Sequence, residues 1–282
     1  MVAILIDSVA VSWYGGKVEI NAFRGRIPKE RCGLRDRNCF TVGVSMLTGP
    51  VQGGWAIAMT WHDLLFIHWP IHANLLRPLI PPSLLIDTFD GEAWIGVVPF
   101  RMTGFRPRYL PSLPWISNFS ELNVRTYVTD GEKHGVWFFS LDASSRLAVR
   151  GARWAFHLPY YDASMSITED TNGIRYNSTR VNRGASAANL TAMYRPVGPV
   201  CHPAQGTIDH WLTERYCLYA TDRHGRVYYG NIYHNHWPLQ PAEAEVEINT
   251  MTEPLGLKLP TTRPLLHFSR RLEVVAWKLR AT

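Results

Sequence analysis

The stretch E-L-N-V-R-T-Y-V-T, residues 121–129, alternates between two kinds of side chain. Leucine, valine, threonine and valine fall on one side, and glutamate, asparagine, arginine and tyrosine fall on the other. Because successive side chains of a strand point to opposite faces, this spacing predicts a strand with one apolar face. Asp130-Gly131 then turns the chain into an apolar strand at Gly135–Asp142. Two strands joined by a tight turn indicate antiparallel β structure.

The same pattern of strands and turns recurs on both sides of this segment. The other expected strands are Leu64–Trp69, Leu84–Phe89, Glu92–Met102, Tyr160–Ile167, Ile174–Asn182, Thr213–Ala220, Val227–His236 and Leu265–Leu279. A short helix is expected over Ala73–Leu79 and a long proline-rich loop over Phe105–Phe119. The one longer helix runs from the capping serines 144 and 145 to about Phe156. Many hairpins and one main helix predict a mainly β (α+β) fold.

Composition points to a globular protein with a large core. The chain has 282 residues, of which 46% are hydrophobic, 12% aromatic and only 18% charged. Its net charge of +6 is spread over the chain, because residues 1–58 hold 7 Lys/Arg and 4 Asp/Glu and residues 59–282 hold 22 and 19. Without a Lys/Arg-rich run, we expect no nucleic-acid partner.

The first 48 residues differ from the rest. The segment from Arg24 to Arg37 is basic and irregular, and the ordered pattern begins near Trp55. We therefore expect a weakly ordered extension over residues 1–48 and a single β domain over residues 49–282. Met46 or Met59 could start a shorter protein; the alternative is that the extension is a genuine accessory arm.

Cysteine usage and hydropathy bear on the compartment. The four cysteines, Cys32, Cys39, Cys201 and Cys217, form no C-x-x-C pair, so neither a zinc knuckle nor a disulfide framework is indicated. Apolar runs fall far short of the ~20 residues that a membrane helix needs, and the first residues make a poor signal peptide. We expect a cytoplasmic protein without a membrane partner, and a homo-oligomer is left open.

Seven phrases resemble the YqjF-like family of uncharacterised bacterial proteins. They are W-H-D-L-L-F-I-H-W-P (Trp61–Pro70), E-A-W-I-G-V-V-P-F-R-M-T-G (Glu92–Gly104), E-L-N-V-R-T-Y-V (Glu121–Val128), G-V-W-F-F-S-L-D-A (Gly135–Ala143), L-T-E-R-Y-C-L-Y (Leu212–Tyr219), H-N-H-W-P-L-Q (His234–Gln240) and P-L-L-H-F-S-R-R-L-E-V-V-A-W (Pro264–Trp277). Together they span most of the last 225 or so residues. The resemblance implies one continuous domain from about Trp55 to the C-terminus.

A more remote resemblance connects the chain with acetoacetate decarboxylase. In R-G-A-R-W-A-F-H-L-P-Y-Y (Arg150–Tyr161) the aromatic residue and the proline of that enzyme's lysine segment are kept. Tyr160 and Tyr161 stand where its two lysines would be, and a phenol cannot form an iminium with a ketone. The resemblance implies a closed, conical antiparallel β-barrel with a central cavity. It does not imply Schiff-base decarboxylation.

The polar face of residues 121–129 holds the first candidate site. The resemblance implies that Glu121 faces the cavity, where burial in an apolar cone would raise the pKa of its carboxyl group and suit acid–base catalysis. Arg125 could bind a substrate carboxylate, with Asn123 beside it. The alternative is a buried Glu–Arg pair that fixes strand register. Tyr160 and Tyr161 are further catalytic candidates; only one can point inward, and a packed aromatic residue is the alternative.

Other candidates are weaker. Arg101, Trp94 and Glu214 are expected to bind substrate, although an ordinary salt bridge is the alternative for Glu214. His234 and His236 form an H-x-H pair, but no third ligand is evident, and we expect no metal and no cofactor. Of the five lysines, only Lys278 lies in an expected strand.

These candidates favour a small-molecule protein. We expect a cavity for a carbonyl- or carboxylate-bearing metabolite and leave open whether the protein is an enzyme. The alternatives are a non-catalytic ligand-binding or sensor protein, and an oligomeric structural protein.

Overall fold

The computed structural model describes residues 4–6, 9–14, 17–22 and 54–282. The chain divides into two compact units, Met1–Leu47 and Thr48–Thr282. In the first, β1 (Ile4–Ile6), β2 (Val9–Tyr14) and β3 (Lys17–Ala22) form an antiparallel sheet. The expected extension over residues 1–48 falls largely outside the described residues and stays a prediction.

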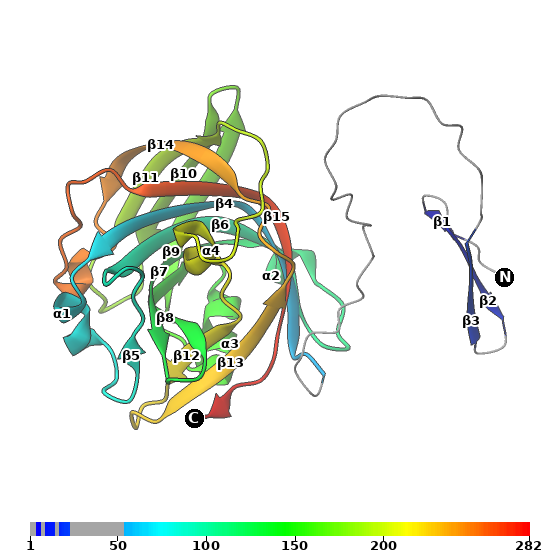
Figure 1. Cartoon of the computed structure of the whole chain (residues 1–282), viewed down its shortest axis with the longest axis horizontal. Helices are drawn as coiled ribbons and strands as arrows, with labels where there is room; N and C mark the ends of the chain where they lie inside the picture. Colours follow the sequence, from blue (N-terminus) through cyan, green and yellow to red (C-terminus); the bar gives the residue numbers. More distant parts are fainter. Residues whose placement is uncertain (1–3, 7–8, 15–16, 23–53) are drawn as a thin grey trace. The chain divides into compact units, whose positions relative to one another are not determined.

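The second unit is built mainly of strands (Figure 1). They are β4 (Ile57–Ile71), β5 (Leu85–Ile86), β6 (Ala93–Pro107), β7 (Phe119–Thr129), β8 (His134–Ala143), β9 (Tyr160–Asp170), β10 (Gly173–Arg180), β11 (Asn189–Pro196), β12 (Cys217–Thr221), β13 (Val227–His234), β14 (Gln240–Asn249), β15 (Leu265–Ala276) and β16 (Arg280–Ala281). The helices are α1 (Ala73–Leu76), α2 (Pro114–Ser117), α3 (Arg146–Phe156) and α4 (Ile208–Thr213), with 3₁₀ turns at Arg77–Leu79 and Glu253–Leu255.

The strands close into a barrel. In order of pairing, β8, β9, β10, β11, β14, β15, β4, β6 and β7 follow one another, and β7 pairs again with β8. This confirms the expected mainly β fold with a closed barrel and one longer helix. Almost all neighbouring strands are antiparallel, but β8 runs parallel to both β9 and β12.

A second path around the sheet positions the cavity. β12 pairs with β8, and β13 pairs with both β12 and β15. β12 and β13 therefore bridge β8 and β15, and they close a smaller ring with β4, β6 and β7. The chain segment between β8 and β9 forms α3, which begins where the Ser145 side chain accepts a hydrogen bond from the backbone of Ala148.

Three local predictions were wrong. The expected loop over Phe105–Phe119 is shorter, because β6 continues to Pro107 and α2 follows. The expected strand from Thr213 begins only at Cys217, because Thr207 caps α4 and residues 208–213 are helical. Strands β11 and β14 were missed, although both alternate in burial.

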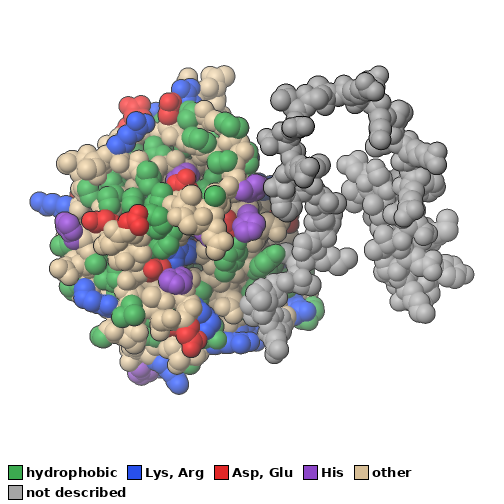
Figure 2. Space-filling model, viewed as in Figure 1, with side chains coloured by type: hydrophobic (Ala, Val, Ile, Leu, Met, Phe, Trp, Pro, Cys, Tyr) green, Lys and Arg blue, Asp and Glu red, His purple; other side chains and the backbone are tan. Residues whose placement is uncertain are grey.

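The core and surface agree with a globular domain. Phe66, Phe268, Tyr176 and Tyr194 are among the largest fully buried side chains. On the face shown in Figure 2, basic and acidic side chains are interspersed rather than gathered by sign. None of the helices in the described part of the chain is long and apolar enough to cross a membrane.

Candidate functional site

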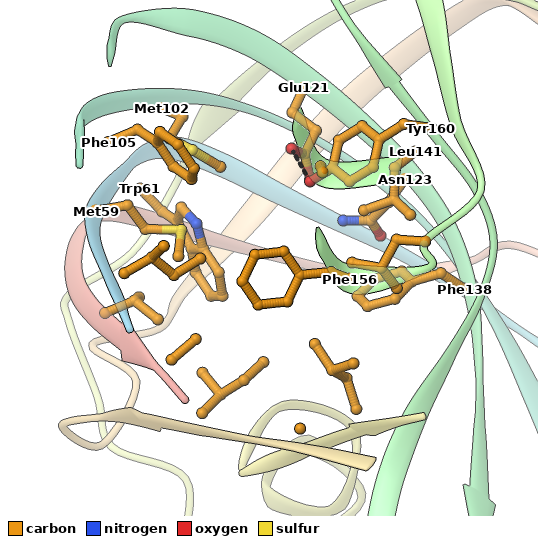
Figure 3. Close-up of a pocket in the computed structure, with 18 of the residues that line it drawn as sticks. Met59, Trp61, Met102, Phe105, Glu121, Asn123, Phe138, Leu141, Phe156 and Tyr160 are labelled. Carbon is orange, nitrogen blue, oxygen red and sulfur yellow. Dashed lines mark hydrogen bonds between the residues drawn. The ribbon is translucent and has the colours of Figure 1, made fainter. Parts of the chain in front are cut away.

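A cavity of about 90 Å³ lies inside the smaller ring of strands (Figure 3). Its wall comes from β4, β6, β7, β8, β12, β13 and β15, together with α3 and the start of β9. Most of its lining is apolar: Ile57, Met59, Trp61, Leu64, Val98, Phe100, Met102, Phe105, Phe138, Leu141, Ala152, Phe156, Leu158, Leu218, Ile232, Val274, Ala276, Trp277 and Leu279. The polar groups are therefore few and stand out against this lining.

Glu121 is the acidic group of the cavity. β7 places its side chain among the lining residues, and the residue is only 3% exposed. Burial raises the pKa of the Glu121 carboxyl to about 8; a hydrogen bond from Tyr160 opposes this rise, and the nearby Asp142 adds to it. At neutral pH the carboxyl is therefore mostly protonated and uncharged.

Tyr160 and Tyr161 point to opposite sides of β9, as alternation requires. Tyr160 lines the cavity, and its hydroxyl donates a hydrogen bond of 2.9 Å to Oε2 of Glu121. Burial raises the pKa of Tyr160 well above its ordinary value, so the phenol stays protonated. Tyr161 lies outside the cavity, where the Arg180 guanidinium stacks over its ring at 4.1 Å.

Asn123 and Arg125 line the same cavity from the face of β7 that carries Glu121. Both are buried, and Arg125 is 9% exposed. Among the described residues, Nε and Nη2 of Arg125 and Oδ1 of Asn123 have no hydrogen-bond partner. The described residues therefore leave two nitrogens of a buried guanidinium and one buried amide oxygen without a hydrogen bond.

The Arg125 side chain is positioned by its surroundings. Its guanidinium carbon lies 5.0 Å from the centre of the Phe66 ring. A Cβ atom at Gly96 would lie 2.8 Å from Cδ2 of His68, so glycine leaves the room that the His68 ring needs, and it would touch Cγ of Arg125 at an ordinary contact distance of 3.5 Å. His68 is fixed in turn by a 2.7 Å hydrogen bond between its Nε2 and the hydroxyl of Tyr127.

Two predicted ligand-binding residues of β6 lie away from the cavity. Arg101 points to the outside of the barrel, where its half-exposed side chain forms a 2.8 Å ion pair with Asp63. Trp94 packs farther along the strand, with Tyr127 and Leu212. Val98, Phe100 and Met102 of β6 line the cavity instead.

Glu214 also lies outside the cavity. It follows α4, and its Oε1 accepts a 2.8 Å hydrogen bond from the backbone N–H of Trp237, while its other oxygen accepts one from the Tyr216 hydroxyl. His236 contacts the same carboxylate at 3.4 Å. The expected strand does not include Glu214, which lies between α4 and β12. Its contact with His236 is of the salt-bridge kind that the sequence left as the alternative.

The H-x-H pair does not converge. His234 is buried and its Nδ1 lies 2.7 Å from the carbonyl oxygen of Asn235, whereas the His236 side chain is largely exposed. The described residues contain no cluster of three or more His, Cys, Asp or Glu side chains that could hold a metal ion. The expectation of no metal stays a prediction.

No lysine is among the described residues that line the cavity. Lys278 is exposed and lies in a groove outside it. The residues that sequence reasoning missed are the aromatic and sulfur-containing ones, such as Trp61, Phe156 and Met102. Their residue type alone does not distinguish a cavity wall from a packed core.

The arrangement offers two chemical functions within one apolar space. Glu121 and Tyr160 form a neutral donor pair that can hydrogen-bond a carbonyl oxygen or transfer a proton. Arg125 supplies a positive charge that can bind a carboxylate. Indole Nε1 of Trp61, also in the cavity wall, has no partner among the described residues and is a further donor.

Comparisons with known proteins agree with the fold. Acetoacetate decarboxylase from Legionella pneumophila superposes with a TM-score of 0.56 at 11% identity, covering 85% of this chain and 93% of the other. The enduracididine biosynthesis enzyme MppR, solved with pyruvate, gives a TM-score of 0.55 at 10% identity, covering 85% and 97%. These similarities show the fold alone.

Sequence comparisons are more specific. The chain is 47% identical over 229 residues to the uncharacterized protein YqjF from Bacillus subtilis, covering 81% of this chain and 93% of that protein. The model of the family DUF2071, described as an uncharacterized conserved protein, matches residues 58–273. The matched region contains every polar residue of the cavity, and the chain belongs to the DUF2071 family.

Proposed function

We propose that the cavity binds a small molecule with a carbonyl or carboxylate group and that Glu121 serves as its general acid or base. The observation that carries this proposal is the position of the Glu121 carboxyl, which is buried in an apolar cavity and accepts a hydrogen bond from the Tyr160 hydroxyl. A group with a pKa of about 8 can both give and take a proton near neutral pH. Perturbed carboxyl groups of this kind cluster at functional sites.

Arg125 and Asn123 provide the ligand's anchor. A buried guanidinium without an acidic partner is costly in the empty protein, and a bound carboxylate would offset that cost. Arg125 takes part in no ion pair among the described residues. The presence of pyruvate in MppR, a protein of the same fold, supports a small carboxylate as the class of ligand.

The chemistry we propose is acid–base rather than imine chemistry. A Schiff base needs a neutral, desolvated amine next to the substrate. The described cavity wall contains no lysine, and Tyr160 occupies the position next to Glu121. Reactions that suit this site are proton transfer at a carbon next to a carbonyl group, and hydration or dehydration at such a carbon.

We keep the cytoplasm as the proposed compartment and a small molecule as the proposed partner, without nucleic acid. Cys201 and Cys217, the two cysteines in the described part of the chain, are not joined in a disulfide.

A binding screen tests the proposal. We expect pyruvate, acetoacetate or 2-oxobutanoate to raise the thermal midpoint of the parent protein, because a ligand that binds only the native state stabilises it. Arg125→Lys and Glu121→Gln should reduce the shift, and the exposed-carboxyl control Glu132→Gln should keep it. No shift with any compound would contradict the proposal and favour a structural role.

Turnover then separates an enzyme from a binding protein. Exchange of the ligand's α-hydrogens with deuterated water, followed by NMR, should be fast in the parent and lost in Glu121→Gln. Binding without exchange or consumption would favour the non-catalytic alternative.

A further inference from the structure

A groove of about 680 Å³ runs along α3 on the outer side of the cavity. Its wall is mostly apolar and is formed by Ala56, Ile57, Phe105, Pro107, Ile116, Leu147, Ala148, Gly151, Ala152, Phe156, His157, Tyr228, Lys278 and Leu279. Leu147 is 61% exposed there. A large apolar side chain so open to solvent at a groove marks a surface that a ligand can cover.

The groove and the cavity share one wall. Ile57, Phe105, Ala152, Phe156 and Leu279 line both spaces. In Figure 3 the ring of Phe156 lies in the middle of the cavity view, between Trp61 and Phe138. Phe156 lies at the end of α3, so rotation of its side chain is one movement by which the two spaces could join.

The groove face of α3 has three small residues between two large apolar ones. Leu147, Ala148, Gly151, Ala152 and Phe156 recur at helical spacing along it. A Cβ atom at Gly151 would meet nothing within 4 Å. The helix therefore leaves open space where a larger side chain would fill the groove.

The buried polar groups lie at the inner end, whereas the polar residues in the groove wall are His157, Tyr228 and Lys278. Glu121, Asn123 and Arg125 line the cavity and do not line the groove. The cavity itself, at about 90 Å³, is smaller than the ~150 Å³ that accommodates a benzene molecule in a protein core. A ligand with more than a few heavy atoms beyond its head group must therefore extend past the shared wall.

We propose that cavity and groove form one binding site for an amphiphile, with a carboxylate or carbonyl head at Arg125 and Glu121 and an aliphatic tail along α3. The inference rests on the proposed function for the position of the head, and it adds the class of ligand. The preferred ligand is then a medium-chain acid or oxo acid rather than a metabolite of three or four carbons.

Titration calorimetry with butanoate and decanoate tests the inference, because the two acids share a head group and differ only in tail length. Each buried methylene contributes ~0.8 kcal/mol, so even partial burial of the longer tail should make decanoate bind at least about tenfold more tightly. Decanol, which lacks the carboxylate, should bind far more weakly than decanoate.

Two variants locate the tail. Gly151→Leu fills the groove, and leucine is a better helix former than glycine, so the variant should fold at least as well as the parent. It should lose the decanoate advantage while keeping butanoate affinity. Leu147→Gln should weaken decanoate a few-fold, and Leu85→Gln, a control with 59% exposure away from the groove, should change neither acid.

The outcomes separate the two proposals. If butanoate and decanoate bind equally, or if Gly151→Leu leaves decanoate binding unchanged, the amphiphile inference is overturned, while loss of butanoate binding in Arg125→Lys would still support the proposed function. If neither acid binds, both proposals are overturned. If the parent is a dimer that Gly151→Leu dissociates without changing decanoate affinity, the groove is an interface between copies and the inference is overturned.

Discussion

Two sets of buried acidic and basic side chains lie near each other in this protein, and they differ in how their charges are compensated. Asp142 of β8 and Arg180 of β10 meet in a bidentate contact, with distances of 2.7 and 2.9 Å, and their side chains are 0% and 3% exposed. Glu121 and Arg125 of β7 are buried as well, but they sit four residues apart on one strand, at a Cα separation of ~13 Å. They form no ion pair with each other.

The difference separates a charge pair that is complete within the protein from the groups that we propose bind a ligand. Each member of the Asp142–Arg180 pair compensates the other, so the pair joins β8 to β10 across the intervening β9 without needing a ligand. The Glu121 carboxyl stays protonated at neutral pH, and the Arg125 guanidinium has no acidic partner among the described residues. The groups without partners line the cavity, where a bound ligand can supply the missing hydrogen bonds.

The largest effect is expected in the pH dependence of the free energy of unfolding, which tests whether Glu121 is uncharged in the folded protein. The pKa of Glu121 is raised from 4.5 to about 8 in the folded state, so its stabilising contribution is full below pH 4.5 and is lost as pH rises to about 8. Glu121→Gln should match the parent near pH 4.5 and exceed its free energy of unfolding near pH 8.5 by up to about 5 kcal/mol. Urea denaturation at both pH values measures this, and parallel pH profiles would show that Glu121 titrates normally.

The two arginines should respond in opposite ways to removal of their charge. Arg180→Met leaves the Asp142 carboxylate buried and unpaired, and we expect a loss of about 3–5 kcal/mol in unfolding free energy. Arg125→Met removes a buried charge without an acidic partner, so stability should be unchanged or higher while carboxylate binding is lost. Chemical denaturation measures the unfolding free energy of both variants. Equal losses of stability would contradict the difference between Arg180 and Arg125.

Crowding around Arg125 can be tested at Gly96. Gly96→Ala places a Cβ atom 2.8 Å from the His68 ring, and we expect a loss of about 1–3 kcal/mol with weakened ligand binding. Gly151→Ala is the matched control in open space, and it should raise stability by about 0.5–1 kcal/mol through helix propensity. A neutral Gly96→Ala would mean that His68 and Arg125 can move without consequence.

The smallest effect is expected at the tyrosines. Tyr160→Phe removes the hydrogen bond to Glu121 and should cost about 1 kcal/mol, while raising the pKa of Glu121 further. The infrared band of the protonated carboxyl would then persist to higher pH. Tyr161→Phe keeps the ring under Arg180 and should leave that band unchanged.

Sequence alternation predicted the central part of the site because it depends on one strand. Glu121, Asn123 and Arg125 share a face for purely local reasons, and the structure shows that this face lines the cavity. The choice between Tyr160 and Tyr161 depended on the direction of β9, which its parallel pairing with β8 determines. No local pattern contains that information.

The misplaced candidates show what alternation leaves out. Trp94 and Phe100 are separated by an even number of residues on β6, so both point to the same face of the strand. Trp94 nevertheless lies beyond the cavity, because alternation predicts the face of a side chain and not its position along the barrel. Arg101 is on the opposite face of β6 and points to the outside of the barrel. Glu214 failed for another reason, since α4 takes up the residues before it and aims its carboxylate at the Trp237 backbone.

The parallel contacts of β8 also have a consequence for the order of assembly. The β12–β8 contact joins Leu218 to Val136, about 80 residues apart in the chain, and contacts of such long range form slowly because loop closure comes first. The hairpins of β6, β7 and β8 can form early from neighbouring residues. The cavity wall also needs β15 to pair with β4, as Leu265 does with His68 across about 200 residues, so the cavity is complete only after the contacts of longest range have formed.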